Sequence, residues 1–83
     1  MSPLDKVAEN IRSVNIQGAK EIAVYGLTFL RKFCRKNGFG LKFEVATMIL
    51  ERARPTAVVL HNCIEILKKK RSIKTINQLL RRL

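Results

Sequence analysis

This sequence has few of the residues from which metal sites and disulfide scaffolds are built. It contains no tryptophan, one histidine and two cysteines, and the cysteines do not form a CxxC pair. A four-ligand zinc site made from cysteine and histidine alone is therefore excluded. Cys34 and Cys63 fall on the apolar faces of expected helices, so we interpret them as reduced core thiols rather than as a disulfide. We expect no metal and no cofactor.

Long apolar runs are also lacking. No stretch approaches the ~18 apolar residues of a membrane span, and the N-terminal segment Met1-Ser2-Pro3-Leu4-Asp5 lacks the apolar core of a signal peptide. These absences predict a soluble, cytoplasmic protein without a membrane partner. The same compartment fits the interpretation of the cysteines as reduced thiols.

Acidic residues are scarce relative to basic ones. The 83 residues include 17 lysines and arginines but 6 aspartates and glutamates, which gives a net charge of +11. Such a charge predicts attraction to nucleic acid, anionic metabolites, acidic protein surfaces or anionic membranes, without choosing among them. A chain of this length forms one small domain that buries roughly 60 to 65% of its unfolded surface.

The pattern of apolar residues is helical along the whole chain. No segment alternates apolar and polar residues over a useful length, as a strand would. We therefore predict an all-α fold, a small bundle of about five helices. The expected helices cover residues 2–13, 18–36, 41–53, 55–70 and 72–83, and Ser2 and Ser72 are the expected N-caps of the first and last.

Two glycines have expected structural roles. Gly26 lies in the middle of the second helix, where Ala23 and Gly26 together would let another helix approach closely. Gly38 follows the basic turn Arg35-Lys36 and provides the left-handed residue that ends many helices. The second helix is therefore the expected centre of the bundle.

The last expected helix is rich in large aliphatic residues for a free terminal segment, and these residues need a surface to cover them. Three alternatives stay open: packing on this domain, pairing with a second copy, or a connector into a further domain. We assign residues 1–71 to a helical bundle domain and residues 72–83 to a terminal helix. Its aliphatic residues are Ile73, Ile76, Leu79, Leu80 and Leu83.

The segment Ala53-Arg54-Pro55-Thr56-Ala57 is the first candidate site. Proline suits the first turn of a helix beginning here and tends to end the preceding one. Arg54 is then held at a junction where a guanidinium and backbone N–H groups face the same space, which is the chemistry of a phosphate or carboxylate site. A plain interhelical turn with a solvated arginine is the simpler alternative.

The segment Ile16-Gln17-Gly18-Ala19 is the second candidate. Gly18 removes a Cβ where a ligand would approach the backbone, and the first N–H groups of the helix that follows are unpaired donors. With Arg54, it would form a polar pocket built from two helix starts. Alone, a glycine at a helix start is common and is better explained as backbone relief than as a ligand site.

Taken together, these segments resemble a known family. Ser13-Val14-Asn15-Ile16-Gln17-Gly18-Ala19, Ile22-Ala23, and Ala53-Arg54-Pro55-Thr56-Ala57 with Leu60 and Asn62 are similar, in order and spacing, to an N-terminal helical domain. The family unites the alpha, beta and delta subunits of translation initiation factor 2B with ribose-1,5-bisphosphate isomerase and methylthioribose-1-phosphate isomerase. The archaeal initiation-factor-2B-like branch is the most similar.

The resemblance implies ligand-binding residues at Gln17, Gly18, Ala19 and Arg54, which would contact a phosphate or sugar. The isomerases carry Arg where this chain has Gln17, and an amide brings no charge to a phosphate. The family's catalytic cysteine and aspartate belong to a further domain, and Cys34 and Cys63 lie on the wrong elements to replace them. The resemblance thus implies no catalysis by this chain on its own, and a final helix that begins an interdomain connector.

Other signals support weaker hypotheses. Lys68-Lys69-Lys70-Arg71 is either a basic patch for nucleic acid or a set of cations that complement a helix C-terminus. This chain is not expected to read DNA bases as a helix-turn-helix does. The second helix of that motif reads bases with polar residues in its first turns, where this chain has Ala57, Val58 and Val59. His61 has no second histidine or matched acid near it in sequence, so we interpret it as a packing residue rather than a base.

These observations order the function hypotheses. The first is a noncatalytic, regulatory-subunit-like helical module of the initiation-factor-2B-like family in protein biosynthesis. It would act through protein contacts, with a partner or a second copy on the terminal helix, and bind part of a phosphorylated sugar or nucleotide. The second is the substrate-capping domain of a ribose-1,5-bisphosphate-type isomerase. The third is a small basic protein that binds nucleic acid nonspecifically.

Overall fold

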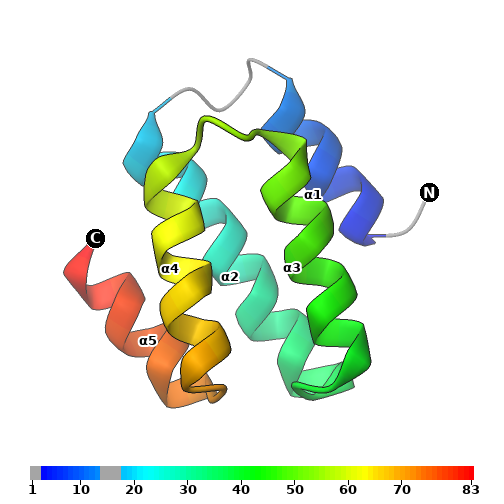
Figure 1. Cartoon of the computed structure of the whole chain (residues 1–83), viewed down its shortest axis with the longest axis vertical. Coiled ribbons are helices and arrows are strands. Elements are labelled where there is room, and N and C mark those ends of the chain that lie inside the picture. The colour runs from blue at the N-terminus through cyan, green and yellow to red at the C-terminus, as the bar shows by residue number, and fades with distance from the viewer. Residues whose placement is uncertain (1–2, 14–17) are drawn as a thin grey trace.

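A computed structural model describes residues 3–13 and 18–83, and within these ranges the chain forms five helices and no strand. The predicted all-α bundle is confirmed. The third helix has the predicted bounds, whereas the N-cap predicted at Ser2 lies outside the described residues. The helices are α1 (Pro3–Arg12), α2 (Ala19–Asn37), α3 (Leu41–Ala53), α4 (Val58–Lys69) and α5 (Ile73–Arg82) (Figure 1).

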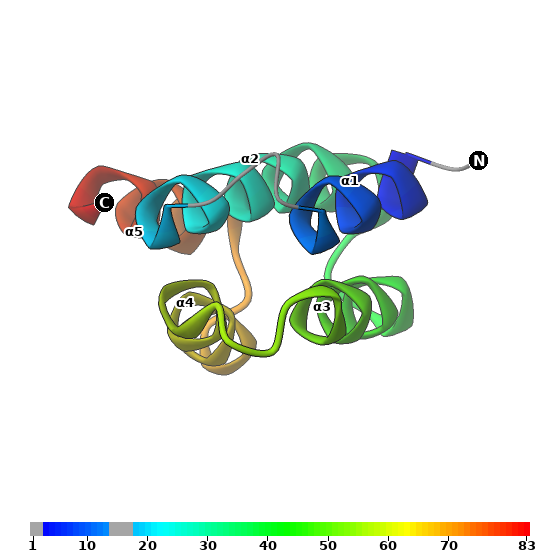
Figure 2. The same ribbon diagram turned by 90° about the horizontal axis from the view of Figure 1, so that it is seen from above.

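The helices form two layers. Seen from above in Figure 2, α1, α2 and α5 lie in one layer, and α3 and α4 lie side by side in the other. The longest helix, α2, contacts each of the other four. The predicted central position of this helix is thereby confirmed.

The core lies between the two layers and draws apolar residues from every helix. Leu27 of α2 is one of the fully buried side chains. Burial of such side chains is worth roughly 1.5 to 3 kcal/mol each, which is the main favourable term in folding. The largest fully buried apolar side chains are Phe43, Ile11, Leu27, Leu30, Leu50, Leu60, Ile64, Leu67 and Ile76.

The close approach predicted at Gly26 is confirmed. This glycine is buried on α2 and faces Leu60 of α4, whose Cδ1 would lie 2.9 Å from a Cβ added at position 26. A Cβ contact of that length does not occur without a shift, so a larger residue at position 26 would require the buried Leu60 side chain to move.

The predicted left-handed helix end is also confirmed. Gly38 has a φ of 78°, and its N–H donates to the carbonyl of Cys34 at 2.7 Å. This bond satisfies a carbonyl at the end of α2 and turns the chain toward α3.

The final helix packs on this domain, which was the first of the alternatives for its aliphatic residues. Ile76 and Leu79 are buried, and Ile73, Leu80 and Leu83 pack against the core while partly exposed. The helix contacts α2 and α4. Its predicted N-cap is confirmed, because the Ser72 hydroxyl accepts a hydrogen bond from the Thr75 N–H at 3.1 Å.

The expected role of Pro55 in the first turn of a helix is wrong. Pro55 and Thr56 form a turn in which the Ala57 N–H donates to the Arg54 carbonyl at 3.0 Å, and α4 begins only at Val58. The fixed φ of proline fits the second position of such a turn as well as it fits a helix start. Arg54 is therefore the C-cap residue of α3 and the first residue of this turn, rather than a residue beside the first turn of α4.

Candidate functional site

The two predicted ligand-binding segments lie at the same end of the bundle. Figures 1 and 2 place the start of α2 and the turn between α3 and α4 at that end, in different layers. Gly18 is the extended N-cap residue of α2, Ala19 is its first residue, and Arg54 is half-buried at the end of α3. Gln17 lies outside the described residues.

An acidic side chain lies at the predicted anion site. Glu21, in the first turn of α2, folds its carboxylate back over Gly18, where an added Cβ would overlap its Oε2. A carboxylate at a helix N-terminus is stabilised by the unpaired N–H groups and the helix dipole. A phosphate that approached the same N–H groups would therefore have to displace Glu21. The position of Glu21 could have been predicted from the sequence, since an acid in the third position of a helix is typical of a helix start.

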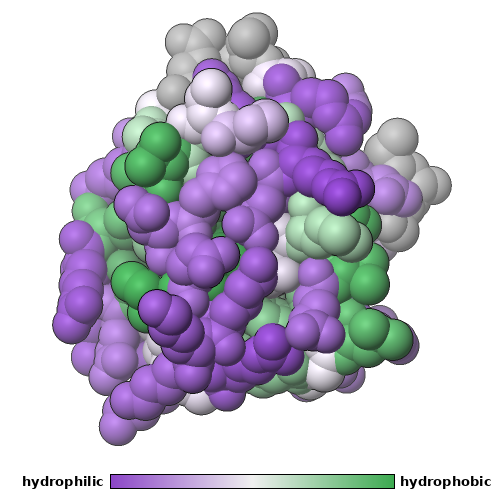
Figure 3. Space-filling view, viewed as in Figure 1, coloured by the Kyte–Doolittle hydropathy of each residue, from purple (hydrophilic) through white to green (hydrophobic). Residues whose placement is uncertain are grey.

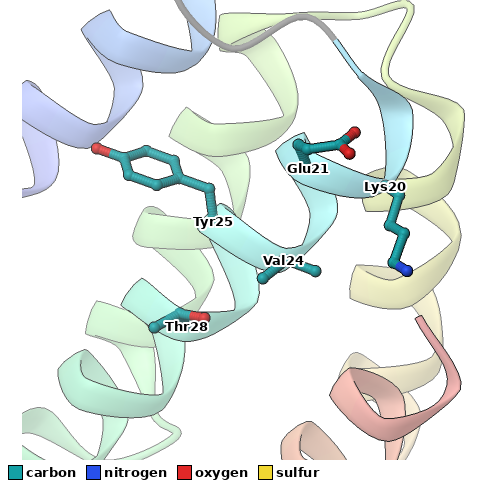
Figure 4. A pocket seen from close by; sticks show the side chains of 5 residues that line it. All are labelled: Lys20, Glu21, Val24, Tyr25 and Thr28. Atoms are coloured by element: carbon teal, nitrogen blue, oxygen red, sulfur yellow. The ribbon is translucent and has the colours of Figure 1, made fainter.

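The hollow nearest to this helix start encloses about 390 Å³. Figure 4 shows its lining along α2, where the Tyr25 ring points toward α1 and Lys20 lies at the opposite edge. One cation and one anion, Lys20 and Glu21, border it together with Val24 and Thr28. Neither Gly18, Ala19 nor Arg54 lines this hollow, so these residues contribute a helix start and a cation rather than a formed pocket.

The basic run after α4 divides into two kinds of residue. Lys68 pairs with Glu51 at 3.0 Å, and Arg71 pairs with Glu44 at 3.1 Å. By contrast, Lys69 and Lys70 are exposed and make no ion pair with any described residue. Figure 3 shows hydrophilic side chains over most of the face formed by α3 and α4. Two of the four predicted patch residues, Lys68 and Arg71, therefore form ion pairs inside the domain.

Arg71 connects three parts of the structure. Besides its ion pair with Glu44, its Nη1 donates to the carbonyl of Phe39 at 3.1 Å, and its guanidinium lies 5.2 Å from the centre of the Phe43 ring. The linker between α4 and α5 is thereby attached to the loop between α2 and α3. Cation–π and charge-assisted bonds of this kind favour arginine over lysine.

His61 is partly buried, as expected of a packing residue, and it has an acidic partner on another helix that spacing along the sequence did not indicate. Its Nδ1 lies 3.1 Å from Oε2 of Glu51, which reaches across from α3 and also pairs with Lys68. The hydrogen bond that Lys68 donates to Glu51 is the main cause of the raised pKa of Lys68. The Nε2 atom of His61 is buried and has no hydrogen-bond partner among the described residues. Glu51 of α3 thus holds two residues of α4, His61 and Lys68, and the cluster connects the two helices.

Both cysteines are buried and unpaired, as predicted. Burial raises the pKa of the Cys34 thiol to about 11 and also raises that of Cys63, so neither sulfur is an activated thiolate. Within residues 3–13 and 18–83, no group of His, Cys, Asp or Glu side chains is arranged to hold a metal ion. The same part of the chain has no helix of the length and apolar character needed to cross a membrane.

A second and larger hollow lies between the beginning of α1 and the second half of α2, where it encloses about 580 Å³. Sequence reasoning did not find it, because it depends on where α1 packs. Its lining combines apolar and basic side chains: Pro3, Leu4, Phe29, Lys32, Phe33, Lys36 and Asn37.

Comparison of the chain with protein-family models, curated proteins and solved structures found no match.

Proposed function

We propose that this chain is a noncatalytic helical module of an initiation-factor-2B-like protein that acts through protein contacts. In this proposal Gln17, Gly18, Ala19 and Arg54 bind part of a phosphorylated sugar or nucleotide. The observation that carries the proposal is the position of the α2 start and the Arg54 turn at one end of the bundle. A guanidinium and the N–H groups of a helix start are the donors that a phosphate accepts.

The proposed site is only part of a binding site. Glu21 covers the start of α2, and no charged side chain stands at position 17. Arg54 and the α2 start therefore supply fewer donors than a phosphate needs for tight binding. We infer that residues from a partner or a further domain complete the site, which is also how the substrate-capping domain of an isomerase would work.

Titration of the 83-residue protein with ribose-1,5-bisphosphate, AMP and a generic RNA at low and high salt tests this function. We expect weak sugar-phosphate or AMP binding that Arg54→Ala abolishes. Arg54→Lys keeps the charge but loses the bidentate fork, so it should recover only part of the binding. Arg52→Ala removes an exposed cation from the last turn of α3 and is the matched control.

RNA binding is the result that would contradict the proposed ligand site. Exposed Lys69 and Lys70 have no described acidic partner, which favours nonspecific phosphate attraction as the second candidate function. RNA binding that falls steeply with salt and is unchanged in Arg54→Ala, without any sugar-phosphate binding, would replace the proposed site by a nucleic-acid surface.

A further inference from the structure

The groove between α1 and α2 has an apolar floor. Leu4 of α1 and Phe29 and Phe33 of α2 line it and are each only partly buried against the core. The two phenylalanines lie one turn apart on α2, with ring centres separated by 5.6 Å and planes tilted by 40°. Partly exposed aromatic rings at helical spacing are typical of surfaces that receive apolar side chains of another protein.

The rim of this groove is basic. Lys32 and Lys36 lie one turn apart beside the phenylalanines, are exposed, and make no ion pair with any residue that the structure describes. On α1, Pro3 and Asn10 both lie toward α2, because Pro3 lines the groove and Asn10 donates to the Tyr25 hydroxyl at 2.7 Å. Helical spacing places Lys6 on the edge between them.

The acidic residues of α1 belong to another edge of that helix. Glu9 pairs with Arg12 at 2.8 Å, and Asp5 precedes Glu9 by one turn. Helical spacing puts these residues on an edge different from the one that carries Pro3 and Asn10. Among the described residues, Lys32 and Lys36 on the rim therefore have no carboxylate partner, whereas Lys6 lies three positions before Glu9.

We propose that this groove is the docking site for an acidic amphipathic helix of a partner protein. The apolar floor would receive leucine or aromatic side chains, and Lys32, Lys36 and Lys6 would pair with flanking glutamates or aspartates. From Phe29 to Asn37 the wall formed by α2 extends about 12 Å at ~1.5 Å per residue, which matches a little over two turns of a bound helix. This inference rests on that part of the proposed function in which the module acts through protein contacts.

A protein helix fits the groove better than a nucleic acid does. Phe29 and Phe33 contact each other with their planes tilted by 40°, so the two rings do not offer parallel faces on which successive bases could stack. Leu4 and Pro3 on the opposite wall offer no polar atom in their side chains to a base or a ribose. The apolar floor is satisfied by leucine, isoleucine or phenylalanine side chains at the spacing of a helix.

The experiment is a fluorescence-anisotropy titration of the full chain with a designed, labelled peptide of about 14 residues, long enough for roughly four turns. The peptide places leucines at i, i+3 and i+7 and glutamates around them. A scrambled peptide of the same composition distributes the leucines around the helix. We expect the scrambled peptide to bind at least about tenfold more weakly, because its anchors no longer share one face.

Charge reversal on the rim gives the second readout. Lys32→Glu combined with Lys36→Glu should weaken binding of the amphipathic peptide about tenfold or more. The matched control combines Lys69→Glu with Lys70→Glu, which makes the same change in net charge at exposed residues outside the groove. The control should change the affinity by less than about threefold at physiological salt.

Chemical-shift mapping shows the place of binding without any variant. Peptide addition should shift the resonances of Leu4, Phe29 and Phe33 more than those of α4. Equal affinity for the scrambled peptide, equal sensitivity to the Lys69 and Lys70 reversals, or absence of peptide binding would each overturn the docking site. RNA that binds with the same shifts, while the peptide does not, would assign the groove to nucleic acid instead.

The two proposals fail independently. Sugar-phosphate or AMP binding that depends on Arg54, together with no peptide binding, refutes the groove and leaves the proposed ligand site in place. Peptide binding that depends on Lys32 and Lys36, with no Arg54-dependent ligand, retains the groove and removes the ligand site. Circular dichroism and thermal unfolding test whether the reversal variants are folded. We expect them to be folded, because Lys32 and Lys36 are exposed.

Discussion

Leu60 occupies the space into which a side chain at Gly26 would extend, since its Cδ1 lies 2.9 Å from the position of a Cβ there. Leu60 is fully buried. Gly26→Val would force it against its neighbours and should lower the free energy of unfolding by about 2 to 3 kcal/mol. Urea unfolding followed by circular dichroism measures the loss.

Gly26→Ala provides the graded comparison. Alanine is worth up to ~1 kcal/mol more than glycine in a helix interior, and this gain offsets part of the steric cost. We expect a net loss smaller than that of the valine variant. If Gly26→Val were as stable as the wild type, α2 and α4 would not be held at the distance described.

Arg71 and Lys70 are neighbours in sequence, but we expect their substitution to change stability to different extents. Arg71→Ala removes the ion pair with Glu44, the bond to the Phe39 carbonyl and the contact with Phe43. We expect a loss of about 1 kcal/mol in the free energy of unfolding, since the Arg71 side chain keeps 35% of its surface exposed and water screens its ion pair. Lys70→Ala should be neutral, because Lys70 is exposed. Equal effects in thermal unfolding would contradict a structural role for Arg71.

The buried thiol of Cys34 predicts a loss of stability in alkali. Its pKa is raised by burial from 9.0 to about 11, so between these values the unfolded chain releases a proton that the folded chain retains. The stabilisation is complete below the unfolded pKa and is lost as the pH rises toward the folded one. Urea unfolding at several pH values should show a steep decline over this range.

Cys34→Ala should flatten that decline even if the variant is less stable at neutral pH. Ser13→Ala, which removes a hydroxyl bonded to the Asn10 carbonyl, is the control without a thiol and should keep the wild-type slope. Cys63 and Lys68, whose pKa values are also raised, contribute equally to all these variants. Identical slopes in Cys34→Ala and the wild type would remove the thiol as the cause.

Glu21 should oppose anion binding at the start of α2. Its carboxylate lies over Gly18, so Glu21→Gln removes a like charge from the path of a phosphate. We expect AMP or ribose-1,5-bisphosphate to bind roughly threefold to tenfold more tightly, as an effect of about 1 kcal/mol implies. Isothermal titration calorimetry measures it, and Glu9→Gln on α1 is the control. An unchanged affinity would place any bound anion away from this helix start.

The sequence predicted the helices well where strong local signals stood at both ends. Gly40 and the Arg54-Pro55 pair bracket α3, and its bounds agree. The start of α4 was less predictable because proline fits a helix start and a turn equally well, and only the bond between Ala57 and Arg54 distinguishes them.

The candidate sites were predicted less completely, because they depend on contacts between helices. The cluster of Glu51, His61 and Lys68 requires α3 and α4 to face each other at a particular rotation. The groove at Phe29 requires the position of α1. Helical periodicity gives the buried face of each helix but not the neighbour that each residue meets.

The central position of α2 has a consequence for how the domain opens. Because α2 contacts all four other helices, neither layer can detach without exposing part of it. Hydrogen exchange should therefore be slowest for the amides around Ala23 to Leu30, near the rate set by global unfolding, and faster at the ends of α1 and α5. The domain would then unfold as one cooperative unit, with no half that persists by itself.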